Sequence, residues 1–127
     1  MYFTDVIVEH SEQEDLAEIR KAHDLIKHIH AHCPNLLHSV IPQLEEELKA
    51  EGIAIRALAT EVVGEMYADK GGVDLARKYP TTFKVWLGRF NDRAASIRTK
   101  SIDATRAILN HHAELRDLIR GTSSVFV

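Results

Sequence analysis

Apolar residues recur along this chain at steps of three and four, which is the spacing of an amphipathic α-helix, and no segment alternates like a half-buried strand. The first clear stripe runs from about residue 15 to residue 33, after a short stretch, 2–8, for which a helix is favoured over a strand. Ser11, followed by Glu14, predicts a capping box at the start of the main helix. Pro34 predicts its end, because the residue before a proline disfavours helical geometry. The positions expected to face inward are Leu16, Ile19, Ala22, Ile26, Ile29 and Cys33.

The same period continues to the end of the chain. Pro42 lies inside the second predicted helix, where a proline should produce a kink. Thr81 or Thr82 is expected to cap a later helix that carries Trp86 and Phe90. The sequence therefore predicts an all-α fold of about five to six helices joined by short loops. The expected helical segments after Pro34 are 36–48, 53–68, 81–90, 94–110 and 112–120, with an irregular tail at 121–127. Gly71 and Gly72 are expected to break the chain, and a short turn of helix is expected to follow up to Lys78.

Shifting the chain by 42 residues superposes apolar positions of two helices and the turn between them. A period of about 40 residues with two helices per unit is typical of HEAT-type repeats. We therefore expect an α-solenoid segment with repeat units at about 1–33, 36–69 and 81–110, and a further helix beginning at 112–120. The superposed pairs include Ile41 and Phe83, Leu44 and Trp86, Leu48 and Phe90, and Arg56 and Arg98.

Two local details agree with such repeats. A proline often bends the first helix of a HEAT unit, and Asp92 and Arg98 have the spacing of residues that form a ladder between neighbouring HEAT units. The position equivalent to Asp92 in the preceding unit is Ala50, so the predicted ladder is incomplete there. The residues predicted to form the repeat framework are Pro42, Arg56, Trp86, Phe90, Asp92 and Arg98.

Three stretches resemble one known family. Residues 86–92, followed by Ile97 and Arg98, resemble the segment "YLGRFND…IR" of the cohesin-associated HEAT-repeat regulators of the precocious-dissociation-of-sisters family. Residues 36–45 are similar to that family's "LLLSVLPQLE", and residues 2–8 resemble its "FF…VLV". The matches follow the family order and cover about residues 2–119. Family members are much longer, so the chain is expected to correspond to a segment of the solenoid, and the tail after Arg120 departs from the family.

The resemblance implies a non-catalytic scaffold in sister chromatid cohesion, located on chromatin in the nucleus. Its implied partners are the kleisin subunit of cohesin, a cohesin-release factor, and flanking repeats of the same long protein. It implies no cofactor and no membrane contact. The residues agree: no Ser/His/Asp order, carboxylate pair or HExxH motif is found, and no apolar run approaches the roughly 20 residues that span a bilayer. The single cysteine suits a reducing compartment.

Charge is unevenly distributed along the 127 residues. Residues 1–67 hold 5 basic and 13 acidic side chains, whereas residues 68–127 hold 11 and 6. This asymmetry indicates either a polar docking surface or ordinary solvated helix faces. The candidate contacts for an acidic peptide, or for a non-specific contact with the DNA backbone, are Lys84, Arg89, Arg93, Lys100 and Arg106.

Histidines crowd the region around Cys33 and suggest a rival function. His28 and His32 share one helix face at a spacing that can hold a metal. An exposed polar face is the favoured interpretation, and Cys33 is expected to be a small buried hydrophobe. Two alternatives remain open. One is a generic HEAT-like adaptor in another complex, and the other is a small helical bundle that binds a metal through its histidines.

Overall fold

The computed structural model describes the backbone of residues 2–120 and the side chains from Gln13 to Arg120. Helices form all the regular structure in this part of the chain, which confirms the all-α prediction. The elements are α1 (Tyr2–His32), η1 (Pro34–Ser39), α2 (Ile41–Leu48), α3 (Ile53–Ala68), α4 (Gly72–Lys78), α5 (Pro80–Leu87), η2 (Gly88–Asn91), α6 (Ala95–His111), η3 (Ala113–Leu115) and α7 (Arg116–Arg120), where η marks a 3-10 helix.

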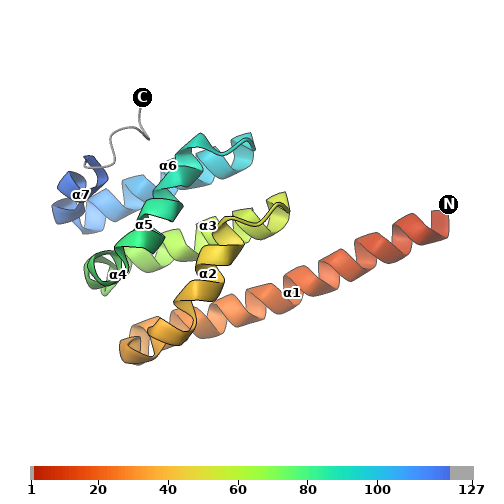
Figure 1. Cartoon of the computed structure of the whole chain (residues 1–127), viewed down its shortest axis with the longest axis horizontal. Coiled ribbons are helices and arrows are strands. Elements are labelled where there is room, and N and C mark those ends of the chain that lie inside the picture. Colours follow the sequence, from red (N-terminus) through yellow and green to blue (C-terminus); the bar gives the residue numbers. More distant parts are fainter. Residues whose placement is uncertain (1, 121–127) are drawn as a thin grey trace.

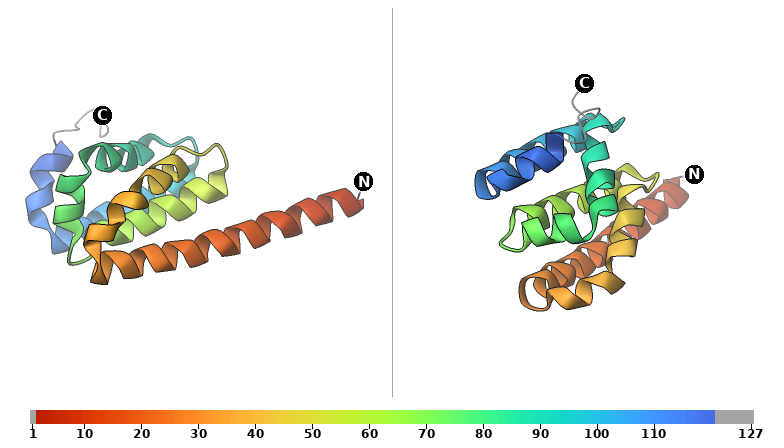
Figure 2. Two further views of the ribbon diagram at one scale, coloured as in Figure 1. Left: turned by 60° about the horizontal axis from the view of Figure 1, so that its bottom comes forward. Right: turned by 60° about the vertical axis from the view of Figure 1, so that its left-hand side comes forward.

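The helices lie in two layers (Figures 1 and 2). One layer contains the long helices α1, α3 and α6, with α3 in the middle, and the other contains α2 and α5, which cross over them. The most extensive packing joins α3 to α6, followed by α2 to α3. Successive helices thus alternate between layers, and α1 and α6 form opposite edges of an open stack. The arrangement is consistent with packed HEAT-like helical hairpins. None of the described helices combines the length and apolarity needed to cross a membrane.

An aromatic cluster anchors the core where α3, α5 and α6 meet. Trp86 is fully buried, and its ring meets the edge of Tyr67 at a centroid distance of 5.4 Å. The indole Nε1 donates a hydrogen bond of 3.0 Å to the backbone oxygen of Thr60. Gly64 lies under this contact, since a Cβ there would approach Ala104 Cβ to 2.8 Å and Trp86 Cζ2 to 3.1 Å. A glycine therefore lets α3 and α6 pack closely.

The first helix differs from the prediction in two respects. It is continuous from Tyr2 to His32, so Ser11 lies within it and does not cap a separate helix. No glycine or proline interrupts this stretch, and the helical spacing simply continues. The buried line of α1 is also rotated relative to the expected stripe: His23, Ile26 and His30 are buried, whereas Ala22 is exposed. Cys33 is exposed as well, contrary to the prediction of a buried hydrophobe.

Two predictions about helix starts are also wrong. Pro42 does not kink a longer helix but lies in the first turn of α2, after the separate turn η1. A proline is tolerated there because its missing N–H would have no partner within the helix. Neither Thr81 nor Thr82 caps α5, since Tyr79 occupies that position. Thr82 lies inside the helix, and its hydroxyl donates to Glu45 Oε1 of α2 at 2.9 Å. The predicted segment 53–68, in contrast, coincides with α3. The short helical turn expected up to Lys78 is α4, which begins at Gly72, a residue expected to lie in the break before it.

Candidate functional site

The carboxylate of Asp92 connects two of the predicted repeat units. Asp92 follows η2, and its side chain is only 2% exposed. Arg56 of α3 donates through Nε to Oδ2 at 2.9 Å and through Nη2 to Oδ1 at 2.8 Å. Arg89 Nη1 also donates to Oδ2 at 3.2 Å, and the backbone N–H of Ala94 donates to Oδ1 at 2.9 Å. Each carboxylate oxygen thus accepts two hydrogen bonds. The hydrogen bonds from Arg56, with smaller contributions from Ala94 and Arg89, hold the pKa of Asp92 below its usual 3.8.

Arg56 and Arg98, which correspond under the 42-residue shift, make matching backbone contacts. Arg56 Nη1 donates to the oxygens of Ala50 and Glu51 at 2.9 and 2.8 Å. Arg98 Nη1 donates to the oxygens of Asp92 and Arg93 at 2.6 and 3.1 Å. The side chain of Asp92 therefore pairs with Arg56, whereas Arg98 contacts only its backbone. Both arginines hold the turn that precedes their own helix.

The predicted basic contacts do not converge on one groove. Lys84 is exposed on α5, Arg93 is exposed in the turn after η2, and Arg106 is exposed on α6. Lys100 Nζ lies 3.1 Å from Glu61 Oε2, so its charge is directed toward α3. Arg89 is half-buried, and its Nη1 donates to the oxygen of Leu48 at 2.9 Å as well as to Asp92. Of the five, only Arg89 and Arg93 line the same hollow.

That hollow, which we call the arginine notch, has a volume of about 590 Å³ and lies between the turn after α2 and the turn after η2. Four cationic side chains and two acidic ones line it. Sequence reasoning missed Lys49 and Glu51, because they belong to the acidic half of the chain and only folding brings them to Arg93. The lining residues are Lys49, Ala50, Glu51, Arg56, Arg89, Asn91, Asp92 and Arg93.

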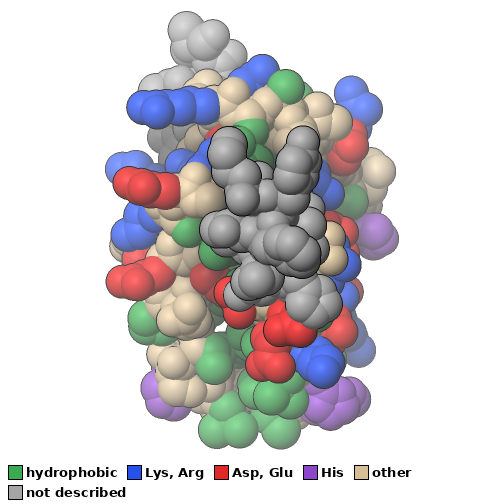
Figure 3. All heavy atoms as spheres, turned by 90° about the vertical axis from the view of Figure 1, so that its right-hand side faces the viewer, with side chains coloured by type: hydrophobic (Ala, Val, Ile, Leu, Met, Phe, Trp, Pro, Cys, Tyr) green, Lys and Arg blue, Asp and Glu red, His purple; other side chains and the backbone are tan. Residues whose placement is uncertain are grey.

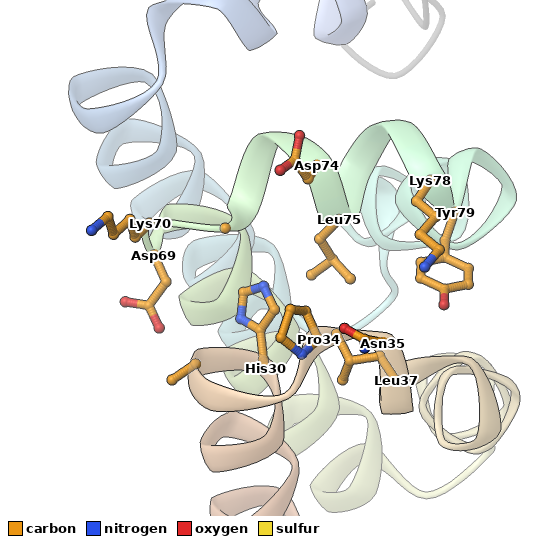
Figure 4. Close-up of a pocket in the computed structure, with 12 residues that line it drawn as sticks. His30, Pro34, Asn35, Leu37, Asp69, Lys70, Asp74, Leu75, Lys78 and Tyr79 are labelled. Carbon is orange, nitrogen blue, oxygen red and sulfur yellow. The ribbon is translucent and has the colours of Figure 1, made fainter.

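A larger hollow, the His30 cavity, lies between the end of α1 and the turn from α3 into α4 (Figure 4). Its volume is about 880 Å³. His30 is buried, and neither of its ring nitrogens has a hydrogen-bond partner among the described residues. The buried hydroxyl of Tyr79 likewise has no partner in this part of the chain. Leu37 and Leu75 contribute apolar side chains to the wall. The charged residues of the lining are two acids and two bases: Asp69, Lys70, Asp74 and Lys78.

Gly71 covers the imidazole of His30, since a Cβ at this glycine would lie 3.0 Å from Nε2. The ring nitrogens therefore have almost no access to solvent, although the ring borders the cavity. Buried polar atoms without partners reduce the free energy of unfolding. The cavity combines apolar walls with two unsatisfied polar groups, which suits ordered water or a small neutral ligand better than an ion.

The other histidines offer no metal centre in the part of the chain that the structure describes. His28 and His32 are exposed, as predicted, with ring centroids 4.4 Å apart. No group of three or more possible ligands gathers there or elsewhere among the described residues. His23, in contrast, is buried, and its Nε2 lies 2.9 and 3.2 Å from the two carboxylate oxygens of Glu47. This pair joins α1 to α2.

Comparison with known proteins gives one consistent result. The family model described as sister chromatid cohesion protein PDS5 matches residues 1–125. The chain is 30% identical over 122 residues to the sister chromatid cohesion protein pds5 of Schizosaccharomyces pombe, which covers 93% of this chain and 10% of that protein. It is 34% identical over 119 residues to PDS5 homolog A of Homo sapiens, covering 92% of this chain and 9% of the human protein.

The relatives are far longer than this chain, which spans about a tenth of their length. A homolog B protein of Xenopus laevis is 32% identical over 96 residues, or 75% of this chain. No solved structure matches.

Proposed function

We propose that this chain, which belongs to the PDS5 family of sister chromatid cohesion proteins, is a docking segment on which cohesin and its regulators bind. Family membership implies a role in sister chromatid cohesion and an association with cohesin, and it places the chain among non-catalytic regulators rather than enzymes. The observation that carries the proposal is the match to the family model over residues 1–125, almost the whole chain.

The finer part of the proposal concerns partners and location. We assign to the segment a nuclear, chromatin-associated role in which the kleisin subunit of cohesin, or a release or maintenance factor, lies along the helical surface. Rigid helical repeats suit this task, because a preorganised surface lowers the ordering cost of binding an extended segment. The candidate contact residues remain Lys84, Arg89, Arg93, Lys100 and Arg106.

The proposed architecture consists of repeat units at about 1–33, 36–69 and 81–110, followed by a helix that begins another unit at 112–120. The pairing of Arg56 with Asp92 across the second and third units supports this division. In this framework Trp86 is fully buried, its ring centroid lies 6.4 Å from that of Phe90, and Pro42 lies in the first turn of α2.

Affinity capture from nuclear extract tests this function. The folded chain, verified by a helical circular-dichroism spectrum, is used as bait, and bound proteins are identified by mass spectrometry. We expect cohesin subunits, the kleisin among them, to be enriched over an unrelated helical-repeat bait of the same size and net charge. Recovery of another complex without cohesin would favour the alternative of a generic HEAT-like adaptor. Recovery of no complex at all would contradict the proposal that this segment docks partners.

A further inference from the structure

We propose that the arginine notch binds a carboxylate side chain of a partner polypeptide, an inference that rests on the proposed docking function and specifies its chemistry. The notch lies where the turn after α2 faces the turn after η2, so a ligand there contacts two repeat units at once. Its lining carries four cationic residues, Lys49, Arg56, Arg89 and Arg93, against Glu51 and Asp92.

Asp92 does not neutralise this charge. Its carboxylate accepts four hydrogen bonds and is 2% exposed, so its capacity is used within the wall of the notch. It balances one of the two guanidiniums that it contacts, Arg56 and Arg89. The two guanidiniums and the carboxylate together therefore carry a net charge of one positive unit below the surface. Solvent and salt screen the attraction of this charge for an incoming anion less than they would at an exposed site.

Three cationic groups around the notch can donate a further hydrogen bond to an acceptor on a ligand. The Nε of Arg89 is buried and has no hydrogen-bond partner among the described residues. The guanidinium of Arg93 is exposed and likewise makes no hydrogen bond or ion pair in this part of the structure. Among the described residues, the one polar contact of Lys49 is a long one, 3.9 Å from its Nζ to Glu45 Oε2. A carboxylate between Lys49 and Arg93 would therefore complete a charge-assisted contact from both sides.

The surroundings favour an isolated carboxylate over a nucleic acid. Glu45, Glu46 and Glu47 lie on the adjoining helix α2, and Glu51 lies in the wall of the notch. A DNA duplex carries one negative charge per ~1.7 Å of axis, so phosphates extending from the notch would meet these acids. A polypeptide can place one acidic side chain in the hollow and neutral or basic residues beside α2.

The test measures binding of a synthetic octapeptide that carries a single glutamate among neutral residues to the whole chain, with the equivalent glutamine peptide as the probe control. We expect binding that weakens as salt rises, because exposed charge pairs are screened. We also expect the Arg89 Nε–Hε resonance to shift in ¹⁵N-edited spectra. Arg93→Gln and Lys49→Gln should each weaken binding about 5-fold, corresponding to about 1 kcal/mol per pair.

Arg77→Gln is the matched control, since Arg77 is an exposed cation on α4, outside the notch and outside the candidate contact residues. All three substituted residues are at the surface, so equal melting temperatures will show that folding is unchanged. Three results would each overturn the proposal: equal binding of the two peptides, an equal loss of binding in Arg77→Gln, or tighter binding of a 20-base-pair duplex than of the glutamate peptide. The peptide assay contains no cohesin, so the two proposals can be separated. A chain that binds the peptide but does not capture cohesin rejects cohesin as the partner and leaves carboxylate binding in the notch intact. Cohesin capture by a chain that does not bind the peptide rejects only the notch.

Discussion

At the scale of single residues, Asp92 shows how one buried charge holds two units together. Its carboxylate lies between Arg56 and Arg89, and its Oδ1 also accepts the N–H of Ala94 just before α6. Removing one member of a buried ion pair leaves the others desolvated without compensation, which costs more than the pair itself contributes. Asp92 is therefore the polar side chain whose loss should most weaken the link between α3 and the start of α6.

The substitution Asp92→Asn should lower the free energy of unfolding by about 3 kcal/mol at neutral pH. This value is near the lower limit for a broken buried ion pair, because the side chain of Arg56 is 12% exposed. Urea unfolding followed by circular dichroism measures this change. Asp103→Asn, at an exposed acid on α6, serves as the control and should alter stability by less than about 0.5 kcal/mol. An equally stable Asp92→Asn variant would contradict the assigned role.

The pH dependence of the same variant has a defined sign. Because the pKa of Asp92 is lowered in the folded chain, its contribution is fully present above the usual value of 3.8 and is lost as pH falls through the folded pKa. The stability difference between wild type and Asp92→Asn should therefore stay constant from pH 7 to about pH 5 and shrink below pH 4. A difference that shrinks already between pH 7 and pH 5 would point to another group.

At the scale of elements, the close crossing of α3 and α6 depends on Gly64. A Cβ there would lie 2.8 Å from Ala104 Cβ and 3.1 Å from the indole of Trp86, and neither neighbour is a flexible chain end. Periodicity predicted α3 at its observed bounds but gave no reason for a glycine in its middle. The reason becomes visible only when α6 is packed against it.

Gly64→Ala tests this crossing. Overpacking costs about 1–3 kcal/mol, whereas alanine in place of glycine gains about 1 kcal/mol of helix propensity, so we expect a net loss and a lower melting temperature. Gly88→Ala is the matched control, because its φ is −59° and, beyond its own helix and chain neighbours, no atom of the described residues lies within 4 Å of the position that a Cβ would take. It should be neutral or slightly stabilising. A stabilised Gly64→Ala chain would show that the two helices are not in close contact.

Local sequence signals predicted most helices but misplaced several boundaries. The break expected at Gly71 and Gly72 falls at the junction of α3 and α4, and the interruption expected at Tyr79 and Pro80 falls at the junction of α4 and α5, because the backbone constraints of glycine and proline act locally. Ser11 does not begin a helix, because α1 is continuous through it. A capping side chain stabilises a helix by about 1 kcal/mol, and the hydrogen bonds of a continuing helix can replace this stabilisation. Thr82 does not cap α5, because its hydroxyl donates a hydrogen bond to Glu45 of α2, a residue distant in sequence.

At the scale of the whole molecule, the two edges of the stack expose apolar side chains. Leu25 and Leu36 are 59% and 54% exposed on α1 and η1, and Ile102 and Leu118 are 43% and 40% exposed on α6 and α7. Figure 3 shows hydrophobic side chains with histidines on both sides at the lower edge of the molecule. A repeat buries its faces against its neighbours, so these edges suit the flanking repeats that the proposed architecture requires.

The candidate site was harder to predict than the fold. The sequence identified Arg89 and Arg93 from the basic half of the chain, but it grouped them with Lys84, Lys100 and Arg106, which the structure places on other surfaces. Lys49 escaped notice because it stands among glutamates in the sequence and reaches the arginines only through folding. The burial of His30 could not be predicted for the same reason, since Gly71, which covers its ring, is 41 positions away in the chain.

The most direct test of the account is the affinity of this chain for purified cohesin kleisin subunit, measured by isothermal titration calorimetry. Docking on a helical-repeat surface predicts saturable one-to-one binding by the folded chain, with a negative heat-capacity change from apolar burial. An unrelated helical-repeat segment of equal size and charge should produce no binding heat. A folded chain that gives no binding heat with the kleisin at any temperature tested would contradict the claim that this segment docks it.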